Sequence, residues 1–139
     1  MPKYRDLSDV SILVVDDTPT ILTMVSTLLL SLGVKKVTTA DSVHSAREKI
    51  PLLTRCPFDL ILLDRYLGEE SGLELLKNIR QVNKEVAVIM LTQEDEAPKV
   101  IEAISLGASD YIVKPFTGDV LVKKLEKALG FTIHTKTPG

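Results

Sequence analysis

The sequence predicts an α/β fold in which a doubly wound, five-stranded parallel sheet has the strand order 2-1-3-4-5. Five short apolar segments alternate with segments whose apolar residues recur at helical spacing. This alternation is typical of strands that are buried on both faces between helices. Right-handed connections between parallel strands then favour a doubly wound (βα)5 arrangement. Two of the apolar segments also end directly in carboxylates, which bears on function.

The predicted strands are brief runs of leucine and β-branched residues, such as the segments ILVV and LILL. Runs of this length suit buried strands and are shorter than most helices. We assign the five strands to Ser11–Val15, Lys36–Thr39, Phe58–Leu63, Val86–Leu91 and Tyr111–Val113. The segment Arg65–Glu70, which follows the third strand, is predicted to be a loop.

The first predicted helix begins at Pro19, with Thr18 as its cap, and stops at Gly33. Proline suits the first helical position because the N–H that it lacks would have no partner within the helix. Its core-facing stripe consists of Ile21, Leu22, Val25, Leu28, Leu29 and Leu32. The other helices are predicted from Asp41 or Ser42 to about Leu53, from Ser71 or Gly72 to Arg80, from about Asp95 to Leu106, and over Gly118–Leu129. Pro98 is tolerated because it falls in the first turn of its helix.

The 139 residues fit one domain, which we place at 10–130 between an N-terminal extension, 1–9, and a C-terminal tail or linker stub, 131–139. The net charge of −2 disfavours direct binding of nucleic acid. A single cysteine, Cys56, excludes an internal disulfide and suits a reducing compartment. Because no signal segment or membrane-length apolar run is present, we expect a cytoplasmic protein that does not contact the membrane.

Acidic residues follow two of the predicted strands: Asp16 and Asp17 the first, and Asp64 the third. The carboxyl ends of parallel strands form the ligand crevice of an open sheet, so these carboxylates should meet there. At an effective dielectric constant of 20 and a separation of ~5 Å, each pair repels by roughly 3 kcal/mol. A cation should offset this repulsion, and Mg²⁺ suits oxygen ligands.

Two further polar residues end strands: Thr92 the fourth and Lys114 the fifth. In the order 2-1-3-4-5, strands 1, 3, 4 and 5 are neighbours, so all these groups should converge. A carboxylate beside Mg²⁺ and a lysine is suited to accept a phosphoryl group, because the cations neutralise the charge of the transferred group. A threonine hydroxyl can donate to a phosphoryl oxygen.

The chain resembles response-regulator receiver domains at the positions just described. Asp16-Asp17, Asp64, Thr92 and Lys114-Pro115 are similar to the five signature positions of that family. The accessory residues match as well: Gly72, Gly107-Ala108 and Tyr111, with the segment GASDYIVKPF being especially typical. The resemblance covers roughly residues 10–129 and implies a flavodoxin-like fold.

The resemblance also implies roles. Asp64 would accept a phosphoryl group from the phosphohistidine of a histidine kinase or phosphotransfer protein. Asp17, Asp64 and the backbone carbonyl of Tyr66 would bind Mg²⁺, and Asp16 would act mainly through water. Lys114 would pair with the acceptor carboxylate and then with the phosphoryl group. Beyond phosphorylating and dephosphorylating itself, such a protein is not an enzyme.

For signalling, the resemblance implies that Thr92 moves onto the phosphoryl oxygen and that Tyr111 turns inward behind it. The peptide bond before Pro115 is expected to be cis. The downstream protein would be bound by the last two helices and the fifth strand.

Two residues depart from the family pattern: Gln93 replaces a small residue after the threonine, and Gly68 replaces a proline four residues after Asp64. We expect three residues, Tyr66, Gln93 and Glu94, to modulate the pocket. Tyr66 and Glu94 would flank the water that attacks the phosphoryl group, and Gln93 would narrow the entrance.

Other functions remain open at this point. Asp16-Asp17 alone would simply cap the following helix. A phosphotransferase of the haloacid dehalogenase type also uses an aspartyl phosphate with Mg²⁺, but Asp64-Arg65-Tyr66 lacks its second aspartate. The third possibility is a receiver-like scaffold that is never phosphorylated, and Gln93 is the residue that suggests it.

Overall fold

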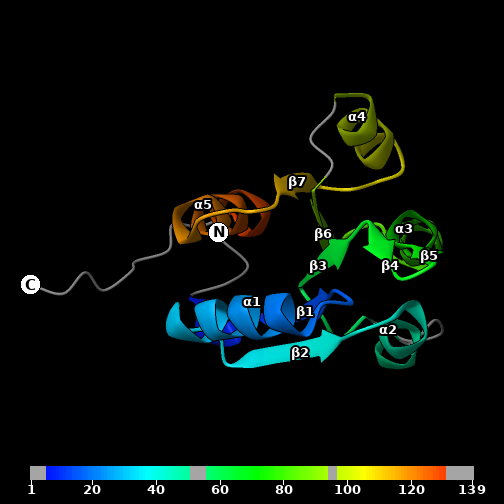
Figure 1. Cartoon of the computed structure of the whole chain (residues 1–139). Coiled ribbons are helices and arrows are strands. Elements are labelled where there is room, and N and C mark those ends of the chain that lie inside the picture. The colour runs from blue at the N-terminus through cyan, green and yellow to red at the C-terminus, as the bar shows by residue number, and fades with distance from the viewer. Residues whose placement is uncertain (1–5, 51–55, 94–96, 131–139) are drawn as a thin grey trace, which may run out of the picture.

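The computed structural model describes residues 6–50, 56–93 and 97–130. Its centre is a five-stranded parallel sheet with the order β2-β1-β3-β6-β7 (Figure 1). The strands are β1 (Ser11–Val15), β2 (Lys36–Ala40), β3 (Leu60–Asp64), β6 (Ala87–Thr92) and β7 (Asp110–Val113). Counted along the chain, these are the first to fifth parallel strands, so the predicted fold and the order 2-1-3-4-5 are confirmed.

Helices cover both faces of the sheet (Figure 1). The helices are α1 (Pro19–Ser31), α2 (Val43–Lys49), α3 (Gly72–Val82), α4 (Ala97–Ser105) and α5 (Gly118–Leu129), and a short 3₁₀ turn, η1 (Leu7–Asp9), precedes β1. α1 and α5 pack on one face together with Leu60 and Leu62, whereas α2, α3 and α4 pack on the other with Ile61 and Leu63. Successive residues of β3 therefore enter different cores, which explains why the strand is apolar throughout. None of the described helices is long and apolar enough to span a membrane.

Some predicted boundaries were wrong. β3 begins at Leu60 rather than Phe58, and α2 ends at Lys49, where Ile50 already has extended backbone. The predicted end of that helix at Leu53, and the predicted start of α4 at Asp95, lie outside the described residues. Thr18 occupies the cap position of α1, but its side chain makes no capping hydrogen bond. The helix start is instead supported by Asp16, whose Oδ1 accepts a hydrogen bond from the Thr18 N–H at 2.9 Å.

The segment predicted to be a loop after β3 also differs. It holds an antiparallel hairpin of β4 (Tyr66–Leu67) and β5 (Glu70–Ser71). Gly68, with φ +66°, begins the two-residue turn between these strands. Strands of two residues carry no periodicity that a sequence pattern could reveal.

Gly72 brings the start of α3 against the end of β3. Its N–H donates to the Arg65 carbonyl at 2.7 Å. A Cβ at this position would lie 1.9 Å from the Asp64 carbonyl oxygen, so no residue larger than glycine fits without moving the backbone. The hairpin is thereby held close to Asp64.

Candidate functional site

Backbone hydrogen bonds continue the sheet beyond the strand ends and position the polar residues that follow. The Asp16 N–H donates to the Ala40 carbonyl at 3.1 Å, and the Lys114 N–H donates to the Thr92 carbonyl at 2.8 Å. Asp64 and Thr92 are the last residues of β3 and β6. The predicted convergence of these groups is observed: they lie at one edge of the sheet, where all but the buried Asp16 line a cavity of about 300 Å³. Its lining comprises Asp17, Thr18, Asp64, Tyr66, Gly68, Thr92, Gln93 and Lys114.

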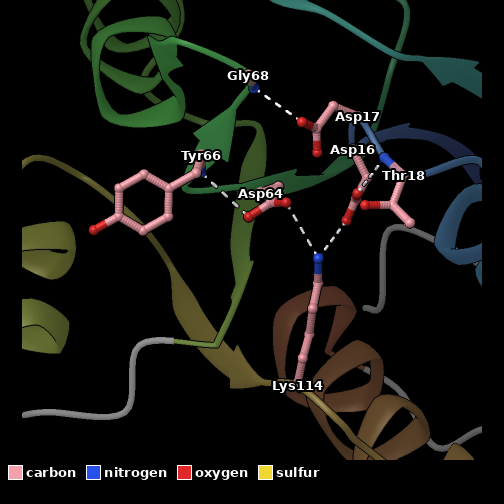
Figure 2. A network of polar contacts seen from close by, with 7 residues as sticks. All are labelled: Asp16, Asp17, Thr18, Asp64, Tyr66, Gly68 and Lys114. Atoms are coloured by element: carbon pink, nitrogen blue, oxygen red, sulfur yellow. Dashed lines mark hydrogen bonds and ion pairs between the residues drawn. The ribbon is translucent and has the colours of Figure 1, made fainter.

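Asp16, Asp64 and Lys114 form a buried ionic cluster (Figure 2). Lys114 Nζ lies 2.5 Å from Asp16 Oδ2 and 3.1 Å from Asp64 Oδ2. Asp16 is fully buried, whereas Asp64 is 7% exposed. Since Asp16 also accepts from the Thr18 N–H, both of its oxygens are engaged. One ammonium group thus bridges two carboxylates from different strands.

Burial and charge act in opposite directions in this cluster. Burial raises the pKa of Asp64 above its ordinary value; Lys114 lowers it, and the charge of Asp16 adds to the increase. For Lys114, burial acts to lower the pKa, but the hydrogen bonds and charges of Asp16 and Asp64 outweigh it, and the net pKa is raised. The lysine therefore stays protonated and positively charged. Because burial disfavours the charged form of Asp64, binding of a further cation would stabilise its carboxylate.

Three carboxylates fit a divalent cation. Asp16, Asp17 and Asp64 each offer one carboxylate oxygen, and these three atoms lie within 4.8 Å of one another. All are hard oxygen donors, and Asp17 is exposed, so an ion can enter from solvent. This donor set suits Mg²⁺, which is bound through one or two carboxylates while keeping several waters.

The two residues expected to switch, Thr92 and Tyr111, are both buried. Thr92 is 1% exposed and faces the cavity, and Tyr111 is 7% exposed and belongs to the core shared by α2, α3 and α4. Tyr111 pairs with Met90 on the neighbouring strand, two residues before Thr92. The peptide bond between Lys114 and Pro115 is cis.

Of the expected pocket modulators, Gln93 is exposed and lines the cavity. Tyr66 also lines it and is 46% exposed, but its ring extends away from the three carboxylates (Figure 2). The Arg65 guanidinium lies 6.0 Å from the centre of that ring. Glu94 lies outside the described residues.

Three contacts were not predicted from the sequence. Lys114 binds Asp16 as well as Asp64, and the Gly68 N–H donates to Asp17 Oδ2 at 2.9 Å. Arg65, which is 4% exposed, reaches α4, where it donates to the Lys99 carbonyl at 3.0 Å and pairs with Glu102. For the contact between Arg65 and α4, the sequence offered one indication, which is an arginine directly after a buried strand.

Comparisons with known proteins agree with this geometry. A family model for the response regulator receiver domain matches residues 12–126. The chemotaxis protein CheY-3 of Vibrio cholerae serotype O1 is 38% identical over 121 residues, which are 86% of this chain and 91% of that protein. The chemotaxis protein CheY1 of Helicobacter pylori is also 38% identical over 121 residues, 86% of this chain and 96% of that protein.

A solved structure of the Vibrio cholerae chemotaxis protein CheY4 has the same fold. It superposes with a TM-score of 0.77 at 33% identity, over 86% of this chain and 98% of that chain. The matched region includes every residue that lines the cavity, from Asp17 to Lys114. The chain therefore belongs to the response regulator receiver domain family, the phosphorylation-activated signalling proteins of two-component systems.

Proposed function

We propose that Asp64 is the residue that accepts the phosphoryl group. It is the carboxylate that both contacts Lys114 and lines the cavity. Asp16 contacts the lysine too, but it is fully buried and does not line the cavity. Asp17 lines the cavity and is exposed, so its charge is more strongly screened by water. This difference among the three carboxylates carries the proposal.

In the reaction, an Asp64 carboxylate oxygen attacks the phosphorus of a phosphohistidine on a histidine kinase or phosphotransfer protein. The P–N bond breaks, the imidazole leaves with the electron pair and takes up a proton, and an acyl phosphate forms on Asp64. Lys114 is already held between Asp16 and Asp64, so its charge is in place for the phosphoryl oxygens. The Thr92 hydroxyl is a further donor on the cavity wall.

Asp17, Asp64 and the backbone carbonyl of Tyr66 would bind Mg²⁺, and Asp16 would act through water. When bound, the ion neutralises charge that builds up on the transferred group. Asp16 has a second role in this proposal, since it orients the Lys114 ammonium at 2.5 Å. Removing Asp16 should therefore affect the lysine as well as the metal.

The signal would pass through Thr92 and Tyr111 to a surface formed by α4, β7 and α5, where a downstream protein binds. Each of these elements carries exposed apolar side chains: Ile101 and Ile104 on α4, Val113 on β7 and Val120 on α5. Exposed apolar side chains on adjoining elements suit a protein partner better than a nucleic acid. Together with the net charge of −2, this supports a protein target.

The test of the acceptor uses a small phosphodonor with Mg²⁺ and intact-mass measurement. The wild-type protein should gain one acid-labile phosphate, and Asp64→Asn should gain none. Asp17→Ala should bind Mg²⁺ more weakly and take up phosphate more slowly. Equal uptake by Asp64→Asn would overturn the assignment.

Beryllofluoride, which mimics the phosphoryl group, tests the switch. Amide resonances of Ala103–Leu106 and Tyr111–Lys124 should move when it binds. If the wild-type protein took up no phosphate and also showed no response to beryllofluoride, it would be a scaffold that is never phosphorylated. Repeated turnover of phosphate esters would instead indicate a phosphotransferase.

A further inference from the structure

A main-chain hydrogen bond joins the β4–β5 hairpin to the acidic cluster. The Gly68 N–H donates to Asp17 Oδ2 at 2.9 Å, across 51 positions of sequence (Figure 2). Both residues line the same cavity. A metal-ligand candidate is thus held by a backbone group of a turn whose position is fixed by the neighbouring strands.

The bond depends on the residue type at position 68. Proline, the residue found here in the family pattern, has no N–H to donate, and its ring fixes φ near −65°. Gly68 has φ +66°, which begins the two-residue hairpin turn. This chain can therefore make a contact to Asp17 that the family pattern excludes.

The bond also leaves part of Asp17 available. Oδ2 accepts from Gly68, and the carboxylate has a second oxygen, Oδ1, for another partner. Outer hydrogen bonds of this kind orient carboxylates that bind metals, and their loss costs about 10–100-fold in metal affinity. The bond also restricts rotation of an exposed side chain that would otherwise sample several rotamers.

We propose that the Gly68 main-chain N–H is a positioning group for Mg²⁺, acting by orienting the Asp17 carboxylate. The proposal rests on the metal site proposed above. It predicts that ion affinity depends on a backbone donor in the hairpin turn, and not on the carboxylates alone. If Mg²⁺ instead needed Oδ2, the Gly68 N–H would compete with the ion, and removing it would strengthen binding.

Three variants at position 68 distinguish a Gly68 N–H that helps Mg²⁺ to bind from one that competes with the ion. Gly68→Pro removes the donor, whereas Gly68→Asn keeps it and tolerates a positive φ. Nothing lies within 4 Å of a Cβ added on the observed backbone, so the asparagine side chain meets no steric obstacle at its first atom. Gly68→Ala keeps the donor but strains the turn, which makes it the control for the backbone change that proline imposes.

Mg²⁺ binding to the full chain is measured by isothermal titration calorimetry. We expect Gly68→Asn to stay within about twofold of wild type and Gly68→Pro to bind about 10–100-fold more weakly. Equal or tighter binding by Gly68→Pro would overturn the proposal. Equal losses in Gly68→Ala and Gly68→Pro would also overturn it, because the turn conformation rather than the donor would then set the affinity.

Amide hydrogen exchange tests the bond without a metal. The Gly68 amide should exchange more slowly in wild type than in Asp17→Ala, where the acceptor is missing. Identical exchange rates in the two proteins would contradict the bond. If wild type bound no Mg²⁺ but this exchange difference was present, the proposed metal site would be wrong, whereas the hydrogen bond from Gly68 to Asp17 would be confirmed.

Discussion

The two sides of the acidic site differ in burial and in the groups that hold their charged side chains. On the buried side, Asp16, Asp64 and Lys114 are held by one another at 2.5 and 3.1 Å. On the open side, Asp17 is exposed and is held by a backbone N–H, and Tyr66 is 46% exposed. The same strand end supplies both sides, since Asp16 and Asp17 are consecutive.

The comparison indicates that the buried side contributes mainly to stability and the open side mainly to binding and reaction rates. Charges on the buried side are poorly screened, so removing one partner leaves an uncompensated charge and carries a high cost. Groups on the open side are screened by water, so substitutions there should alter binding and rates more than stability. Four variants test this division, from the largest expected effect to the smallest.

Replacing the lysine of the buried side should have the largest effect. Lys114→Met leaves Asp16 and Asp64 without their shared cation, and we expect a loss of about 3 kcal/mol in the free energy of unfolding. Urea denaturation without Mg²⁺ measures it. The double variant Asp16→Asn/Lys114→Met should recover part of the loss. A loss below about 1 kcal/mol would show that this cluster is screened like a surface ion pair.

Arg65, the buried residue between Asp64 and Tyr66, tests the link from this site to α4. Arg65→Met removes the hydrogen bond to the Lys99 carbonyl and the pairing with Glu102, for an expected loss of about 2 kcal/mol. Glu102→Gln, at a half-exposed position, should cost only about 0.5 kcal/mol. Hydrogen exchange in α4 should rise in Arg65→Met. If α4 exchanged as in wild type, Arg65 would not support that helix.

Tyr66 tests the open side through the lifetime of the phosphorylated state. Because the ring extends away from the carboxylates, Tyr66→Asn should speed release of phosphate by about threefold at most, a barrier change of roughly 0.65 kcal/mol. Release is timed at fixed Mg²⁺, with Tyr66→Phe as the control that keeps the ring. An acceleration of a hundredfold would show that the ring turns over the phosphoryl group and shields it.

Gln93 should give the smallest effect. It is exposed at the cavity wall, so Gln93→Ala should speed loading from small phosphodonors by about twofold, with unchanged unfolding free energy. Loading is followed by intact mass, and Gln93→Glu, of similar size, is the matched control. A slower Gln93→Ala would mean that the amide helps to bind the donor rather than obstructing it.

Much of this architecture could be predicted from the sequence because its signals are local. Buried strands such as β1 are continuous apolar runs, and α5 was predicted at Gly118–Leu129, where it is observed. Topological rules then place the ends of adjacent parallel strands together, so the convergence of Asp64, Thr92 and Lys114 followed from the order of strands. The resemblance to receiver domains assigned those residues their expected roles.

Other features depended on tertiary contacts. The β4–β5 hairpin has too few residues for a periodic pattern, and the bonds from Gly68 to Asp17 and from Arg65 to α4 join segments 51 and 34 positions apart. Which carboxylate pairs with Lys114 is likewise a matter of distance and burial. Composition and periodicity report which face of an element is buried, but the partner of a polar group is chosen only when separate segments come together in space.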